Sequence, residues 1–541
     1  MKKSLVAVGV IIAVGAVWTG ASWYTGSKVE SEFSRVIEKT NQALAVSLPD
    51  TGIVLKVENY QRGIFSSNAD VLITSADSTD NSDAIVIKTN IDHGPFPVSQ
   101  VAKFNLMPKL AATHVELANN KVTEKLFKYT DGKSLINGTT VIGYGKGIDS
   151  TFDIIPLDIT ENGNSLKFSG AKFVFEGTAD LKDIKASLTS DNTVISSDAE
   201  KESMVLKGLK FTSDITKTDY GFYTGDQALV VENVDVNNNN TAFSFKNLKV
   251  NSATSVADKN AKGSLTYSID DLDVLGQNLG SGKMSLSMDR VSAEALGKFI
   301  TDYNEAISQS LSDGSLPYVA DQLAMRMLST SLPELMKSNP QFAISPLSWK
   351  NAAGESNFDL SIDFNAWTPE ELTNLGMSNK ADEAVKKLFK SFDMNIKLSK
   401  PMLIEAIAQS HSIDSGKVVN AEEKKAFTEQ ATQELTTIEA PLTADMFSSP
   451  YEDMFLTDEQ RAEKAKQKPT PWMVNSDDAL TMSFKFDGND IMVNGQKFAL
   501  ADFLTKMHVM TPTAEEQPEE QIDVQEEIEV PAVSEQAPAA Q

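Results

Sequence analysis

The chain has 541 residues, no cysteine, and 75 acidic against 49 basic residues, which gives a formal net charge of −26. The absence of cysteine excludes disulfides, thiol nucleophiles, zinc–thiolate sites and iron–sulfur clusters. Nucleic acid is disfavoured as a partner, because phosphate binding needs clustered lysine and arginine. The length allows roughly two to four domains and a sizeable hydrophobic core.

The N-terminus begins with a short cytoplasmic segment, residues 1–4, and a predicted transmembrane anchor, residues 5–24. The anchor is a run of twenty apolar or small residues that follows Lys2 and Lys3. As a helix it would span ~30 Å, the thickness of a bilayer core. The lysines mark the cytoplasmic end, and Trp18, Trp23 and Tyr24 suit an interfacial aromatic belt. The alternative is a cleaved secretory signal with its processing site after Ala21.

The anchor also carries small residues at spacings of four, three and four. Small side chains allow helix backbones to approach closely in lipid, so this face predicts dimerisation of the anchor. Its members are Gly9, Ala13, Ala16 and Gly20.

A juxtamembrane helix is predicted over residues 25–48, followed by an antiparallel β-rich region over 49–291. Apolar residues repeat at helical spacing in the first segment and at every second position in the other, as in 265–269 and 284–288. Two alternating pairs, at 243–245 and 248–250, are out of phase and predict a β-bulge between them. A sheet of this length must curve, form layers or line a groove.

The remaining chain is predicted to be a mixed α+β region, residues 292–511, and a disordered acidic tail, residues 512–541. Helices are expected near 292–307, 317–336, 368–391 and 402–440, with strands between and after them. Asp487-Gly488-Asn489-Asp490 between alternating strands predicts a hairpin. The tail combines nine acids with proline and alanine and has no lysine or arginine. The predicted fold class is therefore α+β with β predominant.

Catalytic, metal and cofactor motifs are not found in the sequence. Its four histidines are far apart, and only His93, within Asp92–Pro97, has an unusual setting. Two glycine-rich segments, 276–283 and 143–147, miss the spacing of phosphate-binding loops and are interpreted as turns. The segment 235–246 fails as a calcium loop at its sixth and twelfth positions. We therefore expect no catalytic residues, no metal site and no cofactor.

Several segments resemble the YdgA family of gammaproteobacterial envelope proteins, which carry a domain of unknown function. The resemblance covers roughly residues 1–505 and rests on YQRGIFSS at 60–67, DHGPFPVSQ at 92–100, LGSGKMSLS at 279–287, ISPLSWKNAAGES at 344–356 and VNGQKFALADF at 493–503. It implies a single-pass inner-membrane protein with a periplasmic body, and allows a homodimer.

The recurrent family motifs map to a small set of residues that we interpret as tight turns at strand ends, with a shared ligand-binding surface as the alternative. These residues are Tyr60, Arg62, Gly63, His93, Gly94 and Pro95.

The leading functional hypothesis is a non-enzymatic, membrane-anchored protein of the cell envelope that holds or passes a lipid-like ligand on an apolar sheet face. The alternatives are a homodimeric interaction scaffold or chaperone-like module, and a hydrolase with a noncontiguous site. The expected partners are the membrane, a second copy, a lipid or an envelope protein.

Overall fold

A computed structural model describes residues 2–47, 52–76, 78, 81–238, 242–312, 331–368, 370–371, 380–416, 419–447, 457, 469–507 and 509. In the first helix, the side chains of residues 2–17 lie outside this description. The predicted acidic tail, residues 512–541, lies outside the described residues as well.

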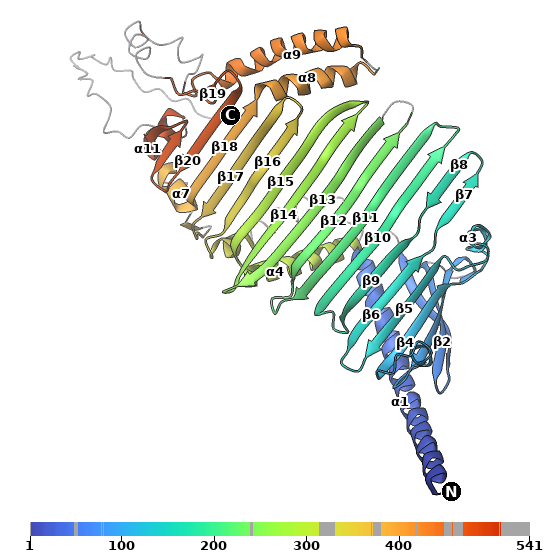
Figure 1. The fold of residues 1–541 in the computed structure, drawn as a ribbon. Helices are drawn as coiled ribbons and strands as arrows, with labels where there is room; N and C mark the ends of the chain where they lie inside the picture. Colours follow the sequence, from blue (N-terminus) through green and yellow to red (C-terminus); the bar gives the residue numbers. More distant parts are fainter. Residues whose placement is uncertain are drawn as a thin grey trace, which may run out of the picture.

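Within the described residues, twenty-two strands form one antiparallel sheet (Figure 1). They are β1 (Ile53–Arg62), β2 (Ser66–Ser75), β3 (Ile85–His93), β4 (Lys109–Leu117), β5 (Ile136–Gly143), β6 (Gly147–Ile154), β7 (Leu157–Glu161), β8 (Asn164–Phe168), β9 (Ala171–Thr178), β10 (Asp183–Ser197), β11 (Glu202–Lys217), β12 (Tyr223–Asn237), β13 (Ala242–Ala257), β14 (Asn260–Val274), β15 (Gln277–Ser292), β16 (Gln341–Asn351), β17 (Gly354–Phe364), β18 (Phe389–Ser399), β19 (Val474–Asn475), β20 (Ala479–Phe486), β21 (Asp490–Val493) and β22 (Gln496–Ala499).

Almost every strand pairs with its neighbour in sequence. The order is β1 to β6, then β9 to β18, then β20, which pairs with both β19 and β21, while β22 pairs with β21. The long strand β10 pairs with β9 along one half and with β8 along the other half, and β7 pairs with β8. The sheet therefore forks at β10 and again at β20, whose two halves pair with β19 and β21, and is a continuous meander between them.

The long strands keep their apolar side chains on one face although their alternation changes phase. In β11, three positions separate Leu206 from Leu209, yet both line one cavity. Between them Gly208 has a φ of +64°, and in β13 Asn247, with a φ of +52°, lies between the two out-of-phase pairs. The pairing of β13 with β12 and β14 shows no register shift there. The predicted β-bulge is therefore wrong. The side-chain alternation shifts by one residue at the same level in neighbouring strands, so no strand gains an extra residue and the pairing stays in register.

The helices are α1 (Lys2–Ser47), α2 (Val98–Val101), α3 (Glu124–Tyr129), α4 (Ala293–Ser312), α7 (Ala381–Leu388), α8 (Lys400–Asp414), α9 (Ala421–Leu442) and α11 (Leu500–Lys506), with a short 3-10 turn η2 (Asn81–Asp83). Figure 1 shows α4 behind the sheet and α1 projecting beyond one end of its strands.

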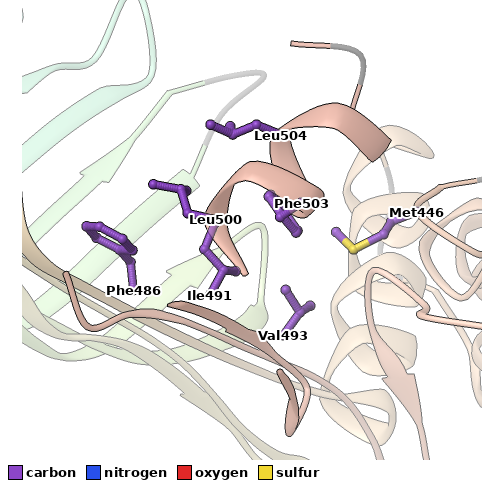
Figure 2. Packing of buried hydrophobic residues seen from close by; sticks show 7 residues of the cluster. All are labelled: Met446, Phe486, Ile491, Val493, Leu500, Phe503 and Leu504. Atoms are coloured by element: carbon purple, nitrogen blue, oxygen red, sulfur yellow. The ribbon is translucent and has the colours of Figure 1, made fainter. Parts of the chain in front are cut away.

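Two hydrophobic clusters hold helices onto the sheet. Leu296 and Ile300 of α4 pack around Val291 of β15 and Ala261 of β14. At the C-terminal end, Leu500, Phe503 and Leu504 of α11 pack against strand residues such as Phe486 and Val493 (Figure 2). A fully buried side chain of this size contributes about 1.5–3 kcal/mol, so these clusters anchor the helices.

The predicted fold class is confirmed in its main feature, a predominantly antiparallel β protein with helices. The sheet does not end at residue 291: β15 pairs with β16 across the segment that contains α4. The predicted anchor and juxtamembrane helix form one helix, α1, which packs on the body through β1, β3 and β4. The hairpin at Asp487–Asp490 is confirmed by the pairing of β20 with β21.

Within the part of the chain that the structure describes, no helix has the length and apolar character needed to cross a bilayer. Most of the predicted anchor, residues 5–17, lies outside the described side chains, and so do Gly9, Ala13 and Ala16 of the small-residue face. Gly20 is described and exposed.

The glycine-rich segment 276–283 is only partly the turn predicted from the sequence. Gly276 lies in the turn before β15, but Gly280 and Gly282 lie within β15. Gly280 has a φ of +94°, and a Cβ atom there would lie 2.0 Å from the carbonyl oxygen of Lys350 in β16. Close approach of the neighbouring backbone thus requires glycine at this strand position.

We predict that Gly280→Ala lowers the free energy of unfolding by about 3 kcal/mol or more, because it adds a backbone clash to an unfavourable φ. Gly276→Ala is the matched control: its φ is +76°, but an added Cβ would meet nothing within 4 Å. The control should lose only about 1–2 kcal/mol. Denaturant unfolding of both variants tests this, and equal losses would contradict the clash.

Candidate functional site

One face of the sheet carries a continuous line of apolar side chains, which we call the apolar row. Its twelve members pair directly with one another from β6 to β20. They are Phe152, Phe173, Leu188, Phe211, Leu229, Val250, Tyr267, Met284, Leu347, Phe358, Ile396 and Met482. At ~4.8 Å per strand spacing, the row is roughly 50 Å long.

The apolar row remains partly open to solvent. Tyr267 is 37% exposed and Leu347 is 42% exposed, and the other members are of intermediate burial. Most apolar side chains on a sheet face of a soluble protein pack under a second layer. A contiguous, partly exposed apolar strip of this length is typical of a surface that binds an apolar ligand or partner.

The opposite face of the same strands is polar. The positions next to the apolar row in β10 to β15 are Ser187, Thr212, Ala228, Asn251, Thr266 and Ser285. Charged pairs also occur on this face: Lys246 of β13 donates a hydrogen bond of 2.7 Å to Asp271 of β14, which lowers the pKa of the Asp271 carboxyl. The two faces thus differ in polarity, and solvent wets the polar one.

The fork in the sheet creates a hollow beside the apolar row. A cavity of about 290 Å³ lies where the partner of β10 changes from β9 to β8. Its lining is mostly apolar and includes Ile154, Phe168, Leu188, Ile195, Met204 and Leu206. Ligand pockets are commonly concave and mainly apolar, so this hollow is a candidate site along the row.

Farther along the same face, the ring of a tryptophan lies against a glycine. A Cβ atom on Gly282 of β15 would lie 2.5 Å from the ring of Trp349 in β16, whose Nε1 donates to the carbonyl of Leu279 at 2.7 Å. These residues belong to the family segments at 279–287 and 344–356. The glycine keeps the indole against the sheet beside the apolar row.

The six site residues predicted from the sequence come together elsewhere, in a contact region that we call the helix socket. It comprises Tyr60, Arg62, Gly63, Ser67, His93, Gly94 and Pro95, from β1, β2, β3 and the turns that join them. Several of them contact α1 directly. The structure thus brings these residues together at the ends of neighbouring strands, where they contact the first helix.

His93 is at the centre of the helix socket. Its Nδ1 lies 3.0 Å from the carbonyl oxygen of Ile64, so this nitrogen must carry the proton. In the neutral ring, Nε2 then accepts from the Ser67 hydroxyl at 2.8 Å, and the Tyr60 hydroxyl donates to Ser67 at 3.2 Å. The imidazole is 1% exposed and Ser67 is 0% exposed. The Ser67–His93 pair has the contact of a nucleophile and its base, but its burial keeps substrate away.

The first helix seals this histidine. Gly26 of α1 lies against the imidazole so closely that a Cβ atom would be 2.4 Å from its Cε1 atom. The neighbouring Thr25 donates through its hydroxyl to the carbonyl of Gly94 at 2.9 Å. Only glycine permits this approach of helix to ring. Gly26 was not singled out from the sequence, since nothing there shows what the helix meets.

Arginine and aromatic contacts extend the socket along α1. Arg62 binds Glu30 at 2.8 Å and lies 5.8 Å from the ring centre of Trp23. Tyr60 packs against Phe33. Higher on the helix, the Asn41 side chain pairs with both the N–H and the carbonyl of Leu55 in β1, at 2.7 and 2.9 Å. The helix thus also occupies hydrogen-bonding groups at the edge of the sheet.

The helix socket and the apolar row belong to the same face of the sheet. His93 pairs through Ala111, Ile142, Ile148 and Gly177 to Ile184 of β10. Ile184 lies four residues from Leu188 and therefore points to the same side. The helix α1 consequently lies at one end of the face that carries the row.

The other histidine and carboxylate contacts of the described residues do not form a candidate binding site. His411 of α8 bonds to Glu434 of α9 at 3.0 Å, and its ring lies 5.8 Å from that of Phe427 in α9, so these contacts join the two helices. Among the described residues, no group of three histidine, aspartate or glutamate side chains is placed to hold a metal ion. His508 lies outside the described residues.

Comparison with known proteins gives the family. Residues 1–501 match the profile of DUF945, bacterial proteins of unknown function, and the chain belongs to this family. It is 27% identical to Protein YdgA of Escherichia coli K12, over 93% of this chain and 96% of that protein. It is 26% identical to the uncharacterized protein YihF of the same organism, over 79% of this chain and 89% of that protein. No solved structure matches the chain. The predicted resemblance is confirmed.

We predict that Gly26→Ala weakens the docking of α1, because its methyl group would collide with the buried His93 ring. Gly20→Ala in the same helix is the matched control, since its Cβ would meet nothing within 4 Å. On helix propensity alone each change should stabilise by up to about 1 kcal/mol. Hydrogen exchange of β1 to β3 should therefore rise in Gly26→Ala only, and unchanged exchange would contradict the socket.

Proposed function

We propose that this protein is a non-enzymatic, membrane-tethered protein of the cell envelope that binds the acyl chains of a lipid-like ligand on the apolar face of its sheet. The apolar row is the observation that supports this proposal most strongly. It pairs in register across twelve strands, remains partly exposed, and lies opposite a polar face.

The dimensions of the row suit acyl chains. A chain that reaches halfway through a ~30 Å bilayer core is ~15 Å long, which corresponds to roughly three strand spacings. The row therefore exceeds the length of one acyl chain several times. The cavity at the fork, with Phe168, Leu188 and Met204 in its lining, provides one concave place along it. A surface of this shape suits either holding several lipids or passing one along the sheet.

The tether supplies a reason for lipid to be the ligand. The apolar run at 5–24 is the predicted anchor, with its N-terminus in the cytoplasm and the body in the periplasm. Because α1 continues from this run into the helix socket, the apolar face would begin at the membrane. A lipid leaving the bilayer could then meet apolar side chains without crossing a long aqueous gap.

The proposal predicts that Leu229→Gln weakens lipid binding, because it replaces a member of the apolar row in the middle of the sheet. Losing one leucine contact removes about 1.5–3 kcal/mol if the ligand fully covers it, which corresponds to roughly tenfold or more in affinity. Val230→Gln is the matched control, since this neighbour in β12 points to the polar face and is similarly half-buried.

The measurement is native mass spectrometry of full-length protein released from its own membrane, followed by titration with a fluorescent phosphatidylethanolamine. Copurifying lipid that Leu229→Gln loses and Val230→Gln retains supports the proposal. A wild-type protein that carries no lipid and does not bind the probe would refute it.

A homodimeric scaffold is the second candidate, favoured by one observation: Gly20 in α1 is exposed and free of contacts within 4 Å of an added Cβ. If Gly9, Ala13, Ala16 and Gly20 pack two anchors together, the Gly9→Ile/Gly20→Ile variant should abolish crosslinked dimers in membranes. The matched control, Val8→Ile, leaves that face unchanged. Dimers that persist in the double variant would remove this candidate.

A further inference from the structure

The end of the sheet from which α1 projects carries a loop with unusual exposed side chains. The segment between β3 and β4 presents Phe104 at 91%, Leu106 at 65% and Met107 at 69% exposure. Three large apolar side chains so close together on a loop would be unfavourable against water alone. Phe104 also has a φ of +58°, a backbone region that bulky residues rarely adopt.

The loop is built to hold this conformation. The backbone N–H of Asn105 donates to the carbonyl of Gln100 at 3.0 Å, and their side chains bond at 3.1 Å. Gln100 is buried, and the N–H of Phe104 donates to the carbonyl of Val101 at 2.9 Å. The hydrogen bonds fix the backbone while the aromatic ring points away from the body. A strained, outward-pointing aromatic residue held in this way indicates a functional contact.

The loop lies beside the point where α1 leaves the sheet. It begins directly after Gly94, whose carbonyl accepts from Thr25 of α1, and it ends at Lys109, whose N–H bonds to the carbonyl of Pro95 at 2.9 Å. Trp18 of α1 packs against Phe65 at the same strand ends, with ring centres 5.6 Å apart. Figure 1 shows α1 projecting from this end of the strands.

The charge of the loop itself differs from that of the chain as a whole. The segment 98–109 contains Lys103 and Lys109 and no acidic residue, in a protein with a net charge of −26. The neighbouring β5–β6 turn, reached through the pairing of Lys109 with Gly143, adds an exposed Tyr144 and Lys146. Aromatic, aliphatic and lysine side chains in this combination suit a bilayer interface with anionic headgroups.

We infer that this end of the sheet rests on the lipid bilayer, with Phe104, Leu106 and Met107 inserted into the headgroup region beside the anchor. The inference rests on the proposed membrane tether and adds a second membrane contact to it. Two contacts, one helix and one loop, would fix the orientation of the body and hold the socket end of the apolar face at the membrane surface.

The absence of cysteine permits a direct test with single-cysteine reporters in the full-length chain. Phe104→Cys, carrying an environment-sensitive NBD label, is reconstituted into vesicles of phosphatidylethanolamine and phosphatidylglycerol. Doxyl-labelled lipids should quench its emission. Val122→Cys is the matched control, because it is exposed at the other end of β4, and it should show no quenching. Met107→Cys serves as a second loop reporter.

A labelled single cysteine at Ala13, in the predicted anchor, distinguishes the membrane tether from the loop contact. Quenching at positions 13 and 104 but not at 122 supports the loop contact. Quenching at 13 alone overturns the inference and leaves the tether intact. No quenching at any position overturns both, and equal quenching at 104 and 122 contradicts a specific orientation.

Discussion

Side chains alternate between two faces along a β-strand, so a strand of fifteen or sixteen residues keeps its apolar side chains together only if that alternation is maintained or reset. In the central strands of this sheet, the alternation of side chains between the two faces shifts by one residue partway along the strand. Gly208 and Asn247 adopt positive φ between two runs of opposite phase, and the pairing continues without a register shift. Because the strands change at one level, the apolar side chains of both halves reach the same face. The cavity at the fork depends on this arrangement, because its lining takes Leu209 from one half of β11 and Met204 and Leu206 from the other half.

The second constraint on the structure is the contact between α1 and the sheet. Gly26 lies against the buried His93 ring, and Thr25 bonds to the carbonyl of Gly94, so the angle at which the helix meets the sheet is fixed by close contact. These contacts place the helix at one end of the face that carries the apolar row. If the run at 5–24 crosses the membrane, this contact determines how the body stands on it. The segments at 60–67 and 92–100 supply residues to this docking contact, among them Arg62, His93 and Gly94.

Some residues of the candidate site can be identified from the sequence. The sequence singles out the motif residues around His93, and the structure places them in one hydrogen-bonded contact region. Alternation in 265–269 and 284–288 correctly indicated strands with one apolar face. The apolar row itself was not predictable, because Tyr267 and Met284 become neighbours only through strand register. The sequence predicts a turn at Gly280 and Gly282, because clustered glycines usually mark turns and no local pattern shows the approach of β16.

The sequence alone determined the features that depend on local composition and short-range period: the apolar N-terminal run, the helix after it, the predominance of antiparallel strands and the absence of thiol chemistry. It also carried enough motif identity to indicate the family. The tertiary structure decided what depends on long-range pairing. One sheet continues from β15 into β16 across α4, both halves of each long strand share an apolar face, and α1 closes over His93. Hydrogen-bond register and helix docking are set between residues far apart in the chain, and no local pattern encodes them.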